Sequence, residues 1–260
     1  GNLALSGLNL ELGRADLVQT RITGTVADLA GQRGIDLTVS ASGDQLGRLN
    51  DLAAPYGVPA DIPALGPFRF ATRLRGDMPS ALSADDVDVA LGDPSLIALT
   101  ATGWMSDVIA QKGINLVVGA RGQELAGLNG LLADYGVPPL PKLGAFDASA
   151  TVIGDVGGRL SANAIAAELG SSKLLHVVAE GVVGDVLAQE GIDIRIAVDG
   201  QEIGRLSDLS LSQGGPDIPA LGPYAVKLAV KGNAAGPLQL PSFDIQLGDG
   251  KTVQLAAAGA

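Results

Sequence analysis

Apolar and polar residues alternate in several stretches of the chain. Between residues 34 and 39, Ile35, Leu37 and Val39 fall at every second position, with polar residues between them. Successive side chains of a strand point to opposite faces of a sheet, so this stretch predicts a strand with one aliphatic face. Related stretches occur at Gly113-Ile114-Asn115-Leu116 and at Gly191-Ile192-Asp193-Ile194.

A second pattern, with apolar residues three positions apart, follows each of these strands. Its members are Leu46, Leu49 and Leu52, then Leu125, Leu128 and Leu131, then Ile203, Leu206 and Leu209. This spacing predicts a short helix with one apolar stripe. The helix dipole would favour the acidic residues in its first turn. We expect the first helix to end near Tyr56-Gly57 and the second near Tyr135-Gly136.

A proline-glycine loop comes next, Ile62-Pro63-Ala64-Leu65-Gly66-Pro67-Phe68. It returns 78 residues later at 140–146 and after the same interval at 218–224. Proline fixes its own φ and can open a strand, and Gly66 can take a positive φ. We therefore expect the loop to lead the chain from the helix into a strand, with Ile62 and Leu65 packed inward. Two further alternating strands follow each loop.

These patterns predict a mainly β fold, an elongated array of β-α-β-β-β units with a period of about 78 residues. We expect residues 1–24 to end a truncated repeat, followed by copies at 25–103, 104–181 and 182–260 in one continuous domain. The units would form a continuous curved sheet or groove with one short helix per repeat. Since the chain opens within a repeat, we expect it to be a piece of a longer protein.

The aliphatic strand positions are the candidate ligand-binding residues. In the first copy they are Ile35, Leu37, Val39, Phe68, Phe70, Leu74, Val87, Val89, Leu91 and Leu99. In the second and third copies they are Ile114, Leu116, Phe146, Val152, Leu169, Val177, Ile192, Ile194, Val226, Leu228, Ile245 and Leu255. They could line an open groove or fill a dry core shared with the helices.

Composition narrows the function classes. Hydrophobic residues make up 47% of the chain, yet no run approaches the roughly 18 apolar residues of a membrane-spanning helix. The net charge of −11 argues against binding to nucleic acid or to an anionic membrane surface. The chain has no cysteine, so disulfides and thiolate chemistry are excluded.

The sequence predicts no catalytic residue, no metal site and no cofactor. His176 is the only histidine, and we expect it at a surface or edge position. The acidic residues Asp85, Asp86 and Asp88 favour a solvated face over an acid/base pair. The arginines at 69, 73 and 75 indicate a solvated outer face, although they could meet a lipid phosphate. Trp104 is expected to pack locally.

The glycine-ended strand, the leucine-rich helix, the Ile-Pro-x-Leu-Gly-Pro-Phe loop and the closing Leu-Gly hairpin together resemble the AsmA-like family of bacterial envelope proteins. The resemblance covers nearly the whole chain. It implies a periplasmic repeating β-groove, usually tethered to the inner membrane by an N-terminal helix that is absent from this sequence. It also implies a link to outer-membrane homeostasis and a groove that carries phospholipid acyl chains. No catalytic motif is transferred by the resemblance.

Two hypotheses therefore remain. The first is a non-enzymatic envelope protein whose apolar groove binds or conducts phospholipid acyl chains between the inner and outer membranes. The second is a structural β-solenoid, a spacer or adhesin-like stalk with a dry core. In either case, exposed sheet edges would allow head-to-tail contacts between copies.

Overall fold

A computed structural model describes residues 3–14, 17–50, 62–78, 80–133, 136, 138–212, 214–248 and 254–259. Three of the predicted features lie outside these residues. They are Leu52 of the first apolar stripe, the expected end of the first helix at Tyr56-Gly57 and the expected end of the second helix at Tyr135.

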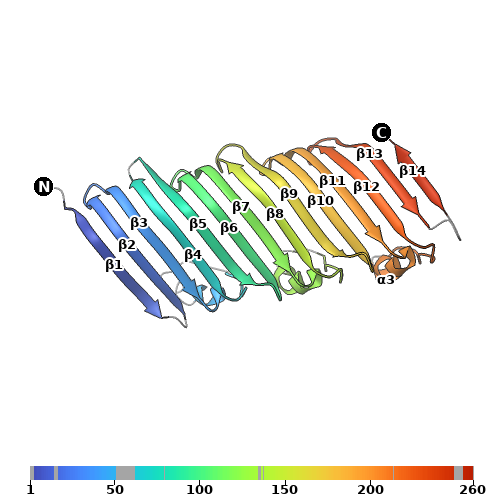
Figure 1. Cartoon of the computed structure of the whole chain (residues 1–260), viewed down its shortest axis with the longest axis horizontal. Helices are drawn as coiled ribbons and strands as arrows, with labels where there is room; N and C mark the ends of the chain where they lie inside the picture. The colour runs from blue at the N-terminus through green and yellow to red at the C-terminus, as the bar shows by residue number, and fades with distance from the viewer. Residues whose placement is uncertain are drawn as a thin grey trace. The chain divides into compact units, whose positions relative to one another are not determined.

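Fourteen β-strands follow one another in chain order through one open antiparallel sheet (Figure 1). β1 and β14 are its two edge strands, so the sheet is not closed on itself. This confirms the prediction of a mainly β fold. The strands are β1 (Leu5–Arg14), β2 (Val18–Asp28), β3 (Arg33–Gly43), β4 (Phe68–Asp77), β5 (Ala81–Asp93), β6 (Ile97–Asp107), β7 (Lys112–Gly122), β8 (Phe146–Gly154), β9 (Leu160–Ser171), β10 (Leu175–Asp185), β11 (Glu190–Gly200), β12 (Tyr224–Gly232), β13 (Leu238–Leu247) and β14 (Leu255–Gly259).

The chain divides into two compact units. Unit 1 comprises Gly1–Ala120 and Thr151–Leu160, and unit 2 comprises Arg121–Ala150 and Ser161–Ala260. Strands β1 to β6 therefore lie in unit 1, and β10 to β14 lie in unit 2. The predicted copy boundaries stay predictions.

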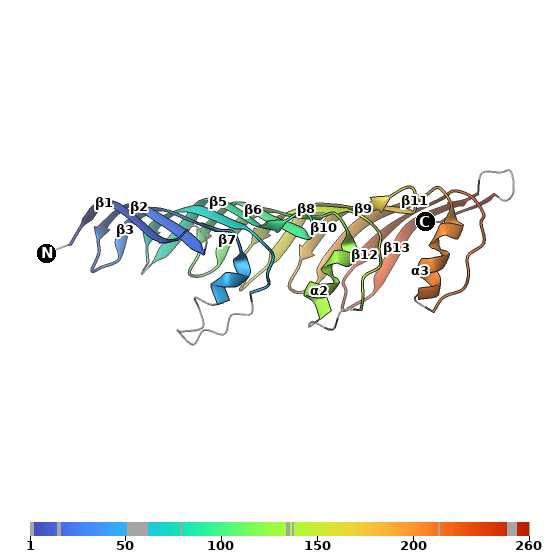
Figure 2. The same ribbon diagram turned by 90° about the horizontal axis from the view of Figure 1, so that it is seen from below.

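Short helical segments follow β3, β7 and β11. The segment after β3 begins with a 3-10 turn, η1 (Leu46–Arg48), and Leu49 and Asn50 continue it in α-helical conformation. After β7, η3 (Leu125–Leu128) continues into α2 (Asn129–Leu132), and after β11, η5 (Ile203–Leu206) continues into α3 (Ser207–Ser212). In unit 2, α2 and α3 project from the same side of the sheet (Figure 2). The described residues thus hold two α-helices, and the prediction of one helix in each copy is not confirmed.

The proline-glycine loops lead into strands as predicted. Gly66, Gly144 and Gly222 have φ values of 104°, 98° and 96°, in the region that glycine tolerates best. Strands β4, β8 and β12 each begin at the aromatic residue that closes the loop. Leu65 is buried, whereas Ile62 is only half-buried, so the inward packing predicted for both residues holds fully for Leu65 alone.

The described residues contain no large side chain that is fully buried. The best-buried apolar side chains, such as Ala84, Ile114 and Leu82, still expose 5%, 6% and 7% of their area. Globular domains normally enclose their core between two packed layers. Within each unit, one layer of strands instead leaves both of its faces accessible. No helix in the described part of the chain is long and apolar enough to cross a membrane.

Candidate functional site

One face of the unit 1 sheet is apolar, because strand register places apolar residues of neighbouring strands opposite one another. Leu37 of β3 lies opposite Gly24 of β2 and Leu74 of β4. Phe70 of β4 lies opposite Val89 of β5. Every second residue of these strands falls on this face, except at a β-bulge in β5, where Ala84 and Val87 share the face. The register brings together all the candidates predicted for the first copy: Ile35, Leu37, Val39, Phe68, Phe70, Leu74, Val87, Val89, Leu91 and Leu99.

Unit 2 has an apolar face of the same construction. Ile194 of β11 lies opposite Gly181 of β10 and Val230 of β12. Val226 of β12 lies opposite Ile245 of β13. The register brings together eight predicted candidates here: Leu169, Val177, Ile192, Ile194, Val226, Leu228, Ile245 and Leu255.

The other four candidates occupy alternate positions of β7 and β8. Ile114 and Leu116 lie on β7, and Phe146 and Val152 lie on β8. Ile114 is buried, and the other three are half-buried.

The candidate list omitted several residues of the unit 2 apolar face. Ile196 and Val198 continue the face along β11, and Phe243 and Leu247 continue it along β13. The alternation that identified Ile192 and Ile194 would also have found Ile196 and Val198.

The apolar faces are accessible rather than sealed. Most candidate side chains are half-buried, and those near the β14 edge are more exposed: Leu255 on β14 exposes 57% of its area, and Ile245 on β13 exposes 37%. In unit 2, α2 and α3 project away from the sheet instead of lying along its strands (Figure 2). A dry core shared with the helices would require helices that lie along the strands.

The opposite face of unit 1 carries a network of exposed ion pairs. The Nε and Nη2 atoms of Arg73 donate to the two carboxylate oxygens of Asp36, each at 2.7 Å. This hydrogen-bonded arginine lowers the pKa of Asp36. Arg75 lies 3.3 Å from Asp85. The solvated face expected for the arginines is present, but acidic partners occupy them. They therefore provide no free cations for a lipid phosphate on this face.

Side chains on the helical segments hold the proline-glycine loops. The Asn129 side chain accepts from the N–H of Leu140 at 2.6 Å and donates to the C=O of Leu140 at 3.0 Å. Asn50 makes the same pair of bonds to Ile62, at 3.0 and 2.9 Å. In the third loop one hydroxyl, that of Ser207, makes both bonds to Ile218 at 2.8 Å.

A carboxylate at the start of the helical segment binds the same loop. Glu124 accepts from the N–H groups of Gly144, Leu143 and Ala126, and these bonds, that from Gly144 foremost, lower its pKa. Glu202 accepts from Gly222 and Gly204 with the same effect. The acidic residues were predicted in the first helical turn. They are instead N-cap residues, because their side chains reach back to backbone donors. Sequence reasoning missed this role, although the recurrence of Gln or Glu at 45, 124 and 202 signalled it.

Turns at the other end of the strands share one hydrogen bond. The side-chain oxygens of Asp77, Asp155 and Asn233 accept from the N–H of a glycine that follows a hairpin turn. The donors are Gly34, Gly113 and Gly191, at 2.7, 2.7 and 2.9 Å respectively. The bonded residues are more than 40 positions apart in sequence, so these contacts tie each hairpin to the strand beyond it.

The single histidine is more constrained than the sequence suggested. His176 of β10 places its Nε2 atom 3.0 Å from Glu168 of β9 and its Nδ1 atom 3.1 Å from Asp199 of β11. The two carboxylates, that of Glu168 foremost, raise the pKa of His176. Because both ring nitrogens are engaged, neither is free to activate a nucleophile. Of the predicted surface or edge position, the edge is wrong, since β10 has a strand on either side, whereas the His176 side chain is partly exposed on the polar face.

Among the described residues, no group of three His, Asp or Glu side chains could hold a metal ion. Trp104 was expected to pack locally, but it exposes 47% of its area.

Comparison of the chain with protein-family models, with curated proteins and with solved structures found no match in any of the three. The resemblance to the AsmA-like family therefore stays a prediction that rests on the residues of the repeated loop and strands.

Proposed function

We propose that the apolar faces of the sheet bind phospholipid acyl chains. The observation that carries the proposal is the aliphatic face of each unit, which strand register makes continuous and whose side chains are mostly half-buried rather than enclosed. Large accessible apolar surfaces typically mark binding sites. An acyl chain that enters such a surface gains up to about 0.8 kcal/mol for each buried CH₂ group.

The chemistry of the face suits a ligand without a fixed shape. Its lining consists of Leu, Ile, Val and Ala with few aromatic rings, and it offers no row of polar groups that would fix a ligand's orientation. The chain's part in the proposal is binding or conduction, with no catalytic step. The full function would be the passage of phospholipids between the inner and outer membranes in support of outer-membrane biogenesis.

The proposal includes the repeat and the family. The order of one strand, one helical segment and three strands occurs three times, and the loop and turn contacts recur with it. These features support three copies with a period near 78 residues and one helix in each copy, and the open sheet would provide the groove. Membership of the AsmA-like family would place the protein in the periplasm, tethered to the inner membrane by a segment outside this chain.

Lipid extraction tests the proposal directly. Protein purified without detergent is extracted into organic solvent, and the extract is analysed by mass spectrometry. We expect phospholipids in stoichiometric amounts with the wild-type chain. A lipid-free extract, together with no uptake of a radiolabelled phospholipid from vesicles, would contradict the proposal and favour the structural spacer.

A pair of adjacent substitutions separates the faces. Leu37→Asp puts a charge on the apolar face, whereas Thr38→Asp puts the same charge on the opposite face of the same strand. We expect Leu37→Asp to lower lipid uptake several-fold with a smaller loss of thermal stability, and Thr38→Asp to change neither. Unfolding of Leu37→Asp alone would favour a structural role for the face. Equal uptake by both variants would contradict acyl-chain binding there.

A further inference from the structure

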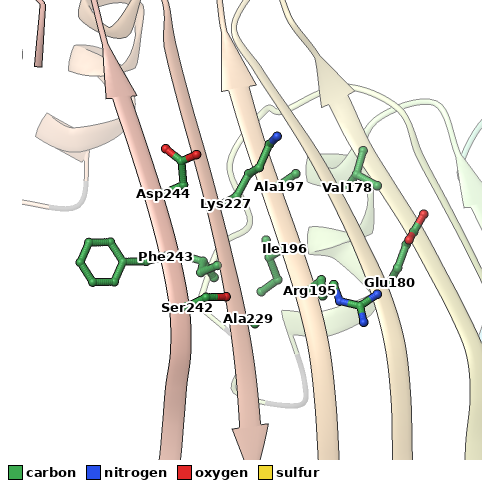
Figure 3. Close-up of a pocket in the computed structure, with 11 residues that line it drawn as sticks. Val178, Glu180, Arg195, Ile196, Ala197, Lys227, Ala229, Ser242, Phe243 and Asp244 are labelled. Atoms are coloured by element: carbon green, nitrogen blue, oxygen red, sulfur yellow. The ribbon is translucent and has the colours of Figure 1, made fainter. Parts of the chain in front are cut away.

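The polar face of unit 2 contains a hollow of about 480 Å³. That volume falls within the range of small-molecule sites, roughly 300–1,000 Å³. Four strands contribute to it, β10, β11, β12 and β13, and its charged lining residues are Glu180, Arg195, Lys227 and Asp244 (Figure 3).

Strand register arranges the lining in two adjacent rows. In one row Glu180 lies opposite Arg195, followed by Ala229 and Ser242. In the other row the order is Val178, Ala197, Lys227 and Asp244. The two cations are thus diagonal neighbours on β11 and β12, at a separation that long side chains can bridge. The two alanines between them leave the space that forms the hollow.

Unit 1 has different residues at the corresponding register positions. Thr38 and Arg73 are partners on β3 and β4, as Arg195 and Ala229 are on β11 and β12. In unit 1 the large side chain of Arg73 extends over this part of the polar face and binds Asp36. In unit 2 the alanine at position 229 leaves the place open, and the arginine stands on the neighbouring strand.

The cations of the hollow also differ from others on the polar faces in having no partner. Arg73 is bound to Asp36, and Lys231 is 2.9 Å from Asp193. Within the described part of the chain, neither Arg195 nor Lys227 makes an ion pair or a side-chain hydrogen bond. Both long side chains are exposed and available to a ligand.

We propose that this hollow binds a small zwitterion, with a carboxylate between Arg195 and Lys227 and an ammonium group at Asp244 or Glu180. The four charged groups sum to zero, so a ligand without net charge complements them, whereas the chain's net charge of −11 repels a free anion. The guanidinium fork of Arg195 matches a carboxylate. The alanines and Val178 offer an apolar floor for a short aliphatic chain between the two charges. Eight of the eleven lining residues belong to the two polar rows, and the other three, Ile196, Leu228 and Phe243, alternate with them along the strands and belong to the apolar face. The charged groups of the site therefore lie on the face opposite to the proposed lipid surface.

Titration by NMR with three probes tests the site. The probes are 6-aminohexanoate, which carries both charges, and hexanoate and hexylamine, which carry one each. We expect saturable shifts of the Ala197 and Ala229 amides with 6-aminohexanoate, at a dissociation constant at least about tenfold lower than with either single-charge probe. Equal binding of all three probes, or no saturable shift at these amides, would overturn the proposal.

Three substitutions complete the experiment. Arg195→Gln and Lys227→Gln each remove one cation and should weaken 6-aminohexanoate binding by roughly tenfold or more. Ala229→Arg places in the hollow the residue that unit 1 has there and should abolish binding. Arg69→Gln changes a polar-face arginine of unit 1 and should leave binding unchanged. Binding that survives both Arg195→Gln and Ala229→Arg would place the ligand elsewhere and refute the site, even if one variant folds poorly.

Discussion

Asn129→Ala provides a sharp test of how the loops are held. The substitution removes both hydrogen bonds between the Asn129 side chain and the backbone of Leu140, at 2.6 and 3.0 Å in a partly buried setting. A hydrogen bond in such a setting contributes about 0.5–1.5 kcal/mol, so the loss should be about 1–3 kcal/mol. Because 1.4 kcal/mol is a factor of ten, protection of the Leu140 amide against hydrogen exchange should fall roughly 5- to 150-fold.

The chain supplies the matched control. In the third loop Ser207 makes both equivalent bonds with one hydroxyl, at 2.8 Å each. Asn129→Ser should therefore retain much of the protection that Asn129→Ala loses. Hydrogen exchange followed by NMR at Leu140 measures both variants, and denaturant unfolding measures the global effect. The reasoning fails if the alanine variant keeps wild-type protection, or if the serine variant is as damaged as the alanine variant.

Three other predictions concern acid, histidine and glycine. Because the pKa of Glu124 is lowered, its contribution to stability is present above the ordinary glutamate pKa and is lost as the pH falls through the lowered value. Protection of the Gly144 amide against hydrogen exchange should therefore drop in acid. Protection of the Gly66 amide should not drop, because its acceptor is the uncharged side chain of Gln45. Because the pKa of His176 is raised, its contribution to stability is present below the ordinary histidine pKa of about 6.5 and is lost as the pH rises through the raised value. A midpoint at or below about 6.5 in an NMR titration of His176 would contradict this prediction. Gly24→Ala should lower the free energy of unfolding in denaturant by more than about 2 kcal/mol, because φ is 140° and the new Cβ would meet the carbonyl oxygen of Asp36. Gly130→Ala in α2 has open space around it and should raise that free energy by about 0.5–1 kcal/mol. Similar values for the two variants would refute the argument.

The strands and their apolar faces could be predicted because alternation is local. The spacing of Ile35, Leu37 and Val39 is enough to predict a strand and its aliphatic face. The positive φ of Gly66 could also be predicted, since it follows from the glycine itself and from its proline neighbours. The exact extent of the α-helices could not be predicted. Ile203, Leu206 and Leu209 predict one continuous helix, but the first four residues form the 3-10 turn η5 and α3 begins only at Ser207, because a 3-10 turn often forms the first turn of a short helix.

The side-chain contacts could not be predicted, because they join positions far apart in sequence. Asp77 meets Gly34 across 43 residues, and His176 meets Asp199 across 23. An aspartate alone does not reveal which backbone N–H it will accept from. The arginines of unit 1 were recognised as a polar face, but their pairing with Asp36 and Asp85 depends on which strand lies beside which.

By itself, the amino-acid sequence determined where strands form, which residues of each strand are aliphatic and where the chain turns, because these depend on neighbouring residues. Only the tertiary structure decided which residues meet. Strand register placed Leu37 beside Leu74 on the apolar face of unit 1, and on the polar face of unit 2 it placed Arg195 and Lys227 diagonally across a pair of alanines. Register is set by hydrogen bonds between strands, and a shift of one residue would exchange the two faces.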